Sequence, residues 1–139
     1  MSFIVFRKKS LSKSLRVLLV DDNLESAQTL AQLLVLSGHE ARHASDAPTA
    51  LELAEQFHPE VVLCELTTAG AIDMPRELRA MPHGERLVIA ALSGQPQPGE
   101  RASTAARGFD AQLIKPLRST VLESFLDDYG TAIAEAPQR

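Results

Sequence analysis

Cysteine is nearly absent from this chain: Cys64 is the single one among 139 residues. One thiol excludes an internal disulfide and fits a protein that works in a reducing compartment. Because Cys64 lies within the apolar run 61–64, we expect a buried and inert thiol rather than a reactive one. The cysteine content therefore excludes a disulfide-stabilised scaffold.

A long hydrophobic run is absent too, because no segment approaches the ~20 apolar residues that a membrane-spanning helix needs. The apolar residues 3–6 precede the basic residues 7–9, the reverse of the order in a secretory signal. We therefore expect a cytoplasmic protein without a membrane partner, in which residues 1–14 form an N-terminal tail. An extra strand and a foot on a membrane surface are the alternatives for this segment.

An excess of positive charge is also missing, since the formal net charge at pH 7 is -4. A nucleic-acid-binding surface needs clustered Lys and Arg to neutralise phosphates, so the composition argues against a nucleic-acid partner. Hydrophobic residues make up 45% of the chain and charged residues 23%, as in ordinary globular domains. The length fits one domain with a normal core.

Four apolar runs are the main positive signal, and each ends in polar side chains. The runs are 15–20 before Asp21 and Asp22, 61–64 before Glu65, 87–92 before Ser93, and 111–114 before Lys115. Segments with helical spacing separate them; in the first, apolar residues recur in steps of three and four between Leu24 and Leu34. We expect a weaker strand at 40–43 and a second helix after a cap at Ser45 or Asp46.

The later helices are less regular. A short helix is expected over 76–81, and a small-residue helix closes at Gly108. The last helix carries an apolar stripe made by Val121, Leu122, Phe125, Leu126 and Tyr129. Strand and helix thus alternate five times, which predicts an α/β fold: a doubly wound parallel sheet of five strands with helices on both faces.

The polar residues that end the runs predict a shared site. In an open parallel sheet the C-terminal ends of the strands meet at one crevice, where ligands bind. Two acids, a third carboxylate, a hydroxyl and a lysine would gather there, a set suited to a divalent cation and a phosphoryl group. Each of these residues taken singly is more often an ordinary loop residue, so the prediction depends on the whole set.

Three segments carry a resemblance to a known family: 17–23 (VLLVDDN), 91–94 (ALSG) and 108–117 (GFDAQLIKPL). In this order and spacing they resemble the receiver domain of bacterial two-component response regulators, above all the receivers of hybrid histidine kinases. The resemblance covers roughly residues 15–130, which leaves 131–139 as a C-terminal tail. It implies a flavodoxin-like fold with strand order 2-1-3-4-5 and five helices.

The resemblance also assigns roles at the site. In receivers an aspartate after the third strand accepts a phosphoryl group from a histidine kinase, and Mg2+ offsets the repulsion between the negative charges. The resemblance implies Asp22 as a direct metal ligand, Asp21 as a ligand mainly through water, and the backbone carbonyl of Thr67 as a third ligand. Ser93 would hydrogen-bond one phosphoryl oxygen, and Lys115 would neutralise another.

The chain departs from the receiver pattern at the acceptor position, where Glu65 stands in place of aspartate. The additional methylene moves the carboxylate by about 1.5 Å, and displacements of this order spoil a reacting geometry. Two consequences compete: Glu65 pairs with Lys115 and imitates the charged state, or it simply blocks the chemistry. In both cases we expect no efficient phosphate acceptance and no enzyme activity.

The loop after Glu65 departs as well. Relatives have a proline four residues after the acceptor and a Met-Asp-Gly turn, whereas this chain has Ala69 followed by Gly-Ala-Ile-Asp at 70–73. The loop is shorter by about two residues, which puts in question Mg2+ binding by the acidic cluster. A remodelled loop beside a changed acceptor favours an altered function over a single neutral replacement.

Gln112 occupies the position where relatives carry an aromatic or histidine switch residue. An amide does not fill the same apolar pocket, which argues against the usual switch, and a surface glutamine on an edge strand is the alternative. By resemblance, the fourth helix, the fifth strand and the fifth helix form a docking or homodimer surface. Its exposed residues are expected to include Arg101, Arg107, Gln112 and Arg118.

The leading hypothesis is an atypical receiver that works as a phosphorylation-independent protein-interaction module in phosphorelay signalling. Its expected partner is a histidine kinase, a phosphotransfer protein or an output protein. One alternative is a functional receiver that still accepts phosphate. A second is a small-molecule-binding flavodoxin-like domain, against which residues 21–23 count because they place negative charge where a glycine-rich phosphate loop belongs.

Overall fold

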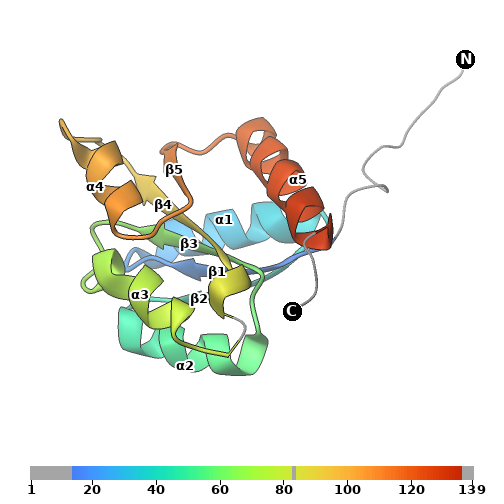
Figure 1. Cartoon of the computed structure of the whole chain (residues 1–139). Coiled ribbons are helices and arrows are strands. Elements are labelled where there is room, and N and C mark those ends of the chain that lie inside the picture. Colours follow the sequence, from blue (N-terminus) through green and yellow to red (C-terminus); the bar gives the residue numbers. More distant parts are fainter. Residues whose placement is uncertain (1–13, 83, 136–139) are drawn as a thin grey trace, which may run out of the picture.

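The fold is built around one parallel sheet with strand order β2-β1-β3-β4-β5 (Figure 1). It is seen in a computed structural model that describes residues 14–82 and 84–135. The strands are β1 (Arg16–Val20), β2 (Glu40–Ala44), β3 (Val61–Glu65), β4 (Val88–Ser93) and β5 (Ala111–Ile114). The predicted α/β class and the flavodoxin-like strand order are confirmed.

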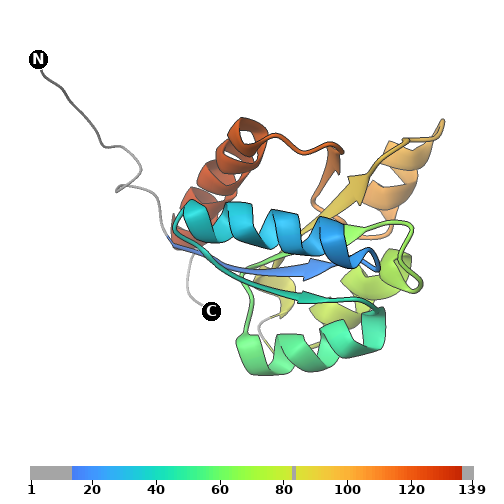
Figure 2. The ribbon, with the colours of Figure 1, turned by 180° about the vertical axis from the view of Figure 1, so that it is seen from behind.

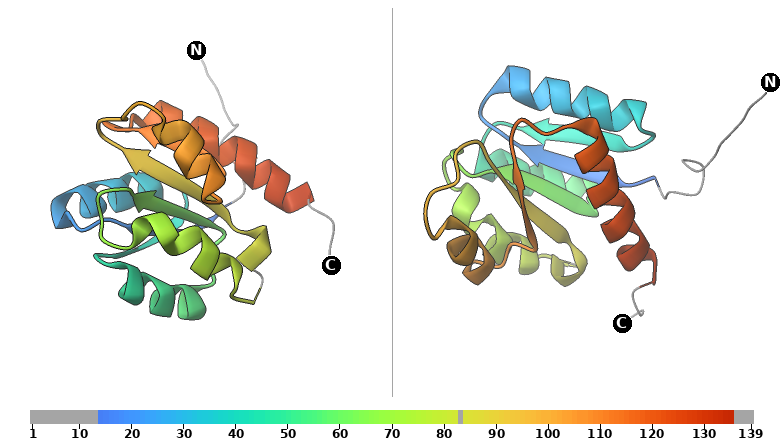
Figure 3. Two further views of the ribbon diagram at one scale, coloured as in Figure 1. Left: turned by 60° about the vertical axis from the view of Figure 1, so that its left-hand side comes forward. Right: turned by 90° about the horizontal axis from the view of Figure 1, so that it is seen from above.

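Helices connect the strands: α1 (Leu24–Leu36), α2 (Ala47–Phe57), α3 (Met74–Arg79), α4 (Glu100–Ala106) and α5 (Ser119–Glu135), with short 3-10 turns η2 (Ala71–Asp73) and η3 (Gly84–Arg86). α1 and α5 cover one face of the sheet, whereas α2 and α3 cover the other (Figures 2 and 3). α4 lies beside β5, the edge strand farthest from β2. No helix within these described ranges is long and apolar enough to cross a membrane.

The sheet separates two apolar cores, because successive residues of a strand point to opposite faces. Leu18 and Val20 of β1 pack with α2 and α3, whereas Val17 and Leu19 pack with α1 and α5. All residues of β3 and β4 are buried, as expected for central strands covered on both faces. Cys64 of β3 is buried as predicted, and burial raises the pKa of its thiol to about 12.

Polar side chains start the first two helices. The Oδ1 atom of Asn23 accepts a hydrogen bond from the backbone N–H of Ser26 at 2.9 Å, and Asp46 does the same for Thr49 at 2.8 Å. These caps satisfy N–H groups that have no partner within the helix. Asp46 is therefore the cap of α2, one of the two residues expected there, and the left-handed backbone of His58 (φ 53°) ends that helix.

Three details differ from the sequence-based expectations. α3 begins at Met74, with Pro75 in its first turn, rather than at residue 76. Leu24 and Val121 belong to the predicted apolar spacing but are 57% and 47% exposed, because the cores already receive the residues one turn further along each helix. α5 continues to Glu135, beyond the expected boundary at residue 130. The predicted N-terminal tail lies outside the described residues as far as residue 13.

Candidate functional site

The C-terminal ends of β1 and β3 bring two carboxylates to the same edge of the sheet. β1 and β3 pair in parallel, with Val20 opposite Cys64. Asp21 follows Val20 and Glu65 follows Cys64, so the two acids come to neighbouring positions. Both acids are 5% exposed. Two buried carboxylates at this edge need a nearby positive charge, because an unpaired buried charge is costly.

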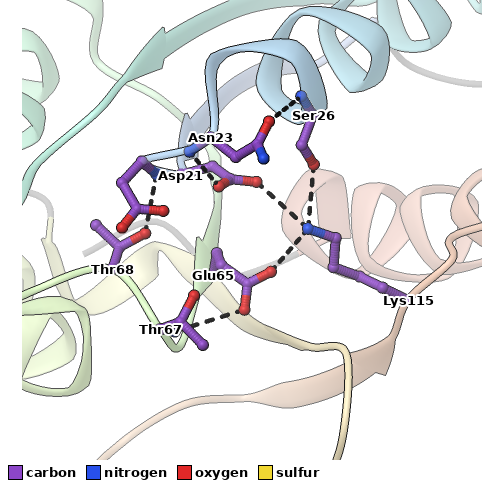
Figure 4. Close-up of polar contacts among 8 residues, drawn as sticks. Asp21, Asn23, Ser26, Glu65, Thr67, Thr68 and Lys115 are labelled. Atoms are coloured by element: carbon purple, nitrogen blue, oxygen red, sulfur yellow. Dashed lines mark hydrogen bonds and ion pairs between the residues drawn. The ribbon is translucent and has the colours of Figure 1, made fainter.

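Lys115 supplies that charge from the end of β5. Its Nζ atom lies 2.8 Å from Oε1 of Glu65 and 3.5 Å from Oδ2 of Asp21, and it also donates to Oγ of Ser26 at 3.1 Å (Figure 4). The backbone N–H of Lys115 donates to the carbonyl of Ser93 at 2.9 Å, which holds β5 against β4. One ammonium therefore links α1 and the ends of β1, β3 and β5.

The electrostatics of the cluster favour a charged lysine. Partial burial by itself lowers the pKa of Lys115. The hydrogen bond and the charge of Glu65, together with those of Asp21, outweigh this effect and raise the pKa above its ordinary value. Lys115 therefore stays protonated throughout the physiological pH range.

Glu65 uses its second oxygen within its own loop. Its Oε2 atom accepts a long hydrogen bond from the backbone N–H of Thr67 at 3.5 Å (Figure 4). One carboxylate oxygen thus faces Lys115, and the other faces the start of the loop after β3. Both carboxylate oxygens of Glu65 therefore contact groups of the chain itself.

The loop between β1 and α1 is held by its own hydrogen bonds. Oδ1 of Asp21 accepts from the N–H of Asn23 at 2.9 Å, and the N–H of Asp22 donates to Oγ1 of Thr68 at 3.1 Å. Thr68 is 3% exposed, so this contact lies beneath the surface. The loop after β3 therefore positions the loop after β1, although the two are more than 40 residues apart in the sequence.

Three of these residues were not expected from the sequence. The role of Ser26 could have been predicted from the sequence. Its hydroxyl group lies in the first helical turn after the acidic pair and therefore faces the same strand ends as that pair. Asn23 is recognisable as a helix cap but not as a partner of Asp21. Thr68 carries no such signal, since only the packing of two loops brings it to the backbone of Asp22.

The side chains of the predicted site residues do not all contact one another. Asp21, Glu65 and Lys115 meet directly, whereas the side chains of Asp22 and Thr67 are exposed. Ser93 is buried at the end of β4. Within residues 14–82 and 84–135, no group of three or more His, Cys, Asp or Glu side chains is placed to hold a metal ion.

The residues predicted for a docking surface lie around α4 and β5. Arg101, Arg107 and Arg118 are exposed, and Arg107 pairs with Asp73 at 2.9 Å. Gln112 was expected to be exposed but is half-buried, because its amide group is hydrogen-bonded to α4. The surface predicted from the sequence therefore consists mainly of the three arginines.

No family model matches the chain, but several curated proteins are similar to it in sequence. The transcriptional regulatory protein PrrA of Mycobacterium tuberculosis is 30% identical over 103 residues, covering 73% of this chain and 43% of PrrA. The response regulator PleD of Caulobacter vibrioides is 30% identical over 114 residues, covering 78% of this chain and 24% of PleD. The chain thus spans less than half the length of these relatives.

Among solved structures, the chain is similar to the receiver domain of the sensor histidine kinase PA1611 from Pseudomonas aeruginosa, which has a magnesium ion coordinated in its active-site cleft. The TM-score is 0.76 at 24% identity, and the similarity covers 86% of this chain and 99% of the other. At this level of identity the likeness establishes the fold alone.

Proposed function

We propose that residues 15–130 of this chain form a receiver domain of the two-component response-regulator type, because its homologues and structural neighbours are such domains. We propose further that this domain acts without phosphorylation. The observation that carries the second part is the 2.8 Å contact between Lys115 and Glu65. In this proposal an internal ion pair stands where the resemblance implies a phosphoryl group. The domain then signals by binding other proteins rather than by accepting phosphate.

The length of Glu65 supports this assignment. One methylene more than aspartate advances the carboxylate by about 1.5 Å, towards the end of β5. There it makes a charge-assisted hydrogen bond with an ammonium that already contacts Asp21. A carboxylate that is paired and 5% exposed is a poor nucleophile, because attack on phosphorus would require it to leave its partner.

The metal requirement changes for the same reason. Asp21, Asp22, Glu65 and the Thr67 carbonyl offer the hard oxygen atoms that Mg2+ prefers. Lys115, however, compensates one of the two buried negative charges, and Asp22 is exposed. We propose that the ammonium takes the place of the cation at these strand ends.

A mass measurement tests the proposal. The intact protein is incubated with a small phosphodonor, such as acetyl phosphate, and Mg2+, and is then weighed. We expect no gain of a phosphoryl mass, because Glu65 is displaced and paired. One stable phosphoryl group located on residue 65 would overturn the proposal.

The substitution Glu65→Asp serves as the matched control. If this variant gains a phosphoryl group that the parent lacks, the rest of the site is competent and the acceptor alone prevents the reaction. If the variant also stays inert, the remodelled loop after β3 prevents phosphorylation as well. Acceptance of phosphate by the parent would favour the alternative of a working receiver.

The proposed output is binding through α4, β5 and α5. The surface carries Arg101, Arg107 and Arg118, which would complement an acidic surface of a histidine kinase, a phosphotransfer protein or an output protein. A homodimer through the same elements belongs to this proposal. A permanent ion pair at the strand ends would make such binding independent of a kinase.

A further inference from the structure

α4 is attached to the domain in an unusual way. It has seven residues, all within the described part of the chain, and of these Thr104 is the buried one. Every residue of the preceding loop, 94–99, is exposed. A helix of this length does not form stably by itself in water, so contacts with the rest of the fold must hold it.

Gln112 of β5 provides two of these contacts. Its Nε2 atom donates a 2.6 Å hydrogen bond to Oε2 of Glu100, the first residue of the helix. Its Oε1 atom lies 3.2 Å from Oγ1 of Thr104, one turn further along, whose single hydroxyl proton is shared with the carbonyl of Arg101 at 3.0 Å. Residues four apart lie on the same side of a helix, so one amide spans the face of α4 that meets β5.

The carboxylate of Glu100 extends the connection into the loop. Its other oxygen, Oε1, accepts a 3.4 Å hydrogen bond from the backbone N–H of Gln97. Gly99, which precedes the helix, offers no side-chain cap. Glu100 therefore connects the exposed loop, the start of α4 and β5 through one ionised group.

The remaining support of α4 is at its C-terminal end. Arg107 and Asp73 form an ion pair at 2.9 Å, but their side chains are 51% and 50% exposed, and such pairs contribute little. The N–H of Phe109 donates to the carbonyl of Thr104 at 3.2 Å. At the N-terminal half of the helix, the side-chain hydrogen bond to another strand or helix is the one from Gln112 to Glu100.

We propose that Gln112, Glu100 and Thr104 form a hydrogen-bonded bridge that sets the position of α4 on β5 and thereby governs the docking surface. The bridge holds α4 on β5 through polar contacts, so loss of the donor group of Gln112 should loosen the helix. Its consequence for partner binding rests on the proposed function, whereas the bridge itself does not. It gives Gln112 a role other than that of a surface residue.

Hydrogen–deuterium exchange of the isolated chain tests the bridge with the substitution Gln112→Glu. This change keeps the acceptor for Thr104 but removes the donor to Glu100 and sets two carboxylates about 2.6 Å apart. We expect exchange of the α4 amides to become faster by roughly tenfold or more, because a hydrogen bond to a charged group is lost and repulsion is added. Exchange in α1 and α2 should stay as in the parent.

The reciprocal change provides the control. Glu100→Gln retains one oxygen that accepts from Gln112 but loses the charge and the second acceptor, which faces the N–H of Gln97, so α4 should exchange faster than in the parent but more slowly than in Gln112→Glu. In the double variant Gln112→Glu with Glu100→Gln, the new amide donates to the new carboxylate, and slow exchange should return. An unchanged rate in Gln112→Glu, or a failure of the double variant to restore slow exchange, would overturn the bridge.

A second substitution covers the case in which Gln112→Glu unfolds the whole domain. Gln112→Met has a similar length and no charge, and it removes both hydrogen bonds without repulsion. Faster exchange confined to α4 supports the bridge, and exchange equal to that of the parent refutes it. No partner and no phosphodonor is present in these measurements, so their outcome is separate from that of the phosphorylation test.

Discussion

Among its contacts, Glu65 has its largest effect through Lys115. The 2.8 Å contact between their side chains is accompanied by the 3.5 Å approach of Asp21, and both carboxylates are nearly buried. Removal of one partner from such a cluster leaves buried charge without compensation, which costs more than the pair itself contributes. The cluster is therefore a stability element in addition to a functional one.

Lys115→Met should destabilise the domain by about 2 kcal/mol, below the range for fully buried pairs because Lys115 is partly exposed. The measurement is chemical denaturation at neutral pH. Ion pairing raises the pKa of Lys115 in the folded protein, so its contribution is complete below the unfolded value of 10.5 and declines as the pH rises through the folded pKa.

Addition of Glu65→Gln to Lys115→Met provides the control, because it removes one of the two uncompensated charges. We expect the double variant to regain part of the lost stability. A Lys115→Met variant as stable as the parent would show that the ion pair does not contribute to folding. Stability lost equally in the single and double variants would point to packing rather than to charge.

At the scale of secondary-structure elements, one arginine of α3 connects segments that are distant in the sequence. The guanidinium of Arg79 donates to the carbonyls of Gly84, Leu87 and Gly108 and pairs with Asp110 at 2.8 Å. These partners belong to the turns before β4 and β5. Arg79 therefore holds two turns against the C-terminal end of α3, one of which is the turn that follows α4.

Arg79→Met should lower the free energy of unfolding by about 2 kcal/mol, because the partly buried carbonyls of Gly84 and Leu87 lose their donor. Thermal and chemical denaturation measure the change. Arg79→Lys should recover less than half of it, since an ammonium does not reproduce the fork of donors. Full recovery with lysine would mean that the positive charge, and not the geometry, is what matters.

At the scale of the whole molecule, the ammonium of Lys115 supplies positive charge to the carboxylates at the C-terminal ends of β1 and β3. If Lys115 replaces a cation, Mg2+ gains little by binding. We expect 10 mM Mg2+ to leave the thermal midpoint of the parent unchanged within error, whereas a site with a dissociation constant of about 1 mM would add roughly 1.4 kcal/mol. Differential scanning calorimetry with and without Mg2+ measures this.

Lys115→Met is the informative comparison for this measurement. Without the ammonium, Asp21 and Glu65 retain two negative charges at one strand edge, and Mg2+ should then raise the thermal midpoint. A Mg2+ effect of equal size in the parent would show that the lysine and the cation bind side by side. It would count against the proposed replacement of the metal.

The global arrangement was predictable because its signals are local. Apolar runs of four to six residues, separated by segments with helical spacing, indicated alternating strands and helices, and parallel pairing follows from the length of the connections. The boundaries of α3 and α5 were less accurate. Pro75 permits an earlier start than residue 76, and α5 continues through Gly130, a residue type that often ends helices, to Glu135.

The sequence by itself determined the α/β fold and the residue types that stand at the ends of β1, β3, β4 and β5, since hydrophobic periodicity depends on short segments, whereas the strand order was implied by the family resemblance. Only the tertiary structure decided that Lys115 contacts Glu65, Asp21 and Ser26, that Thr68 supports Asp22, and that Gln112 connects to α4. Most of these contacts join residues far apart in the chain. Their choice depends on side-chain length and loop packing, which a one-dimensional pattern does not contain.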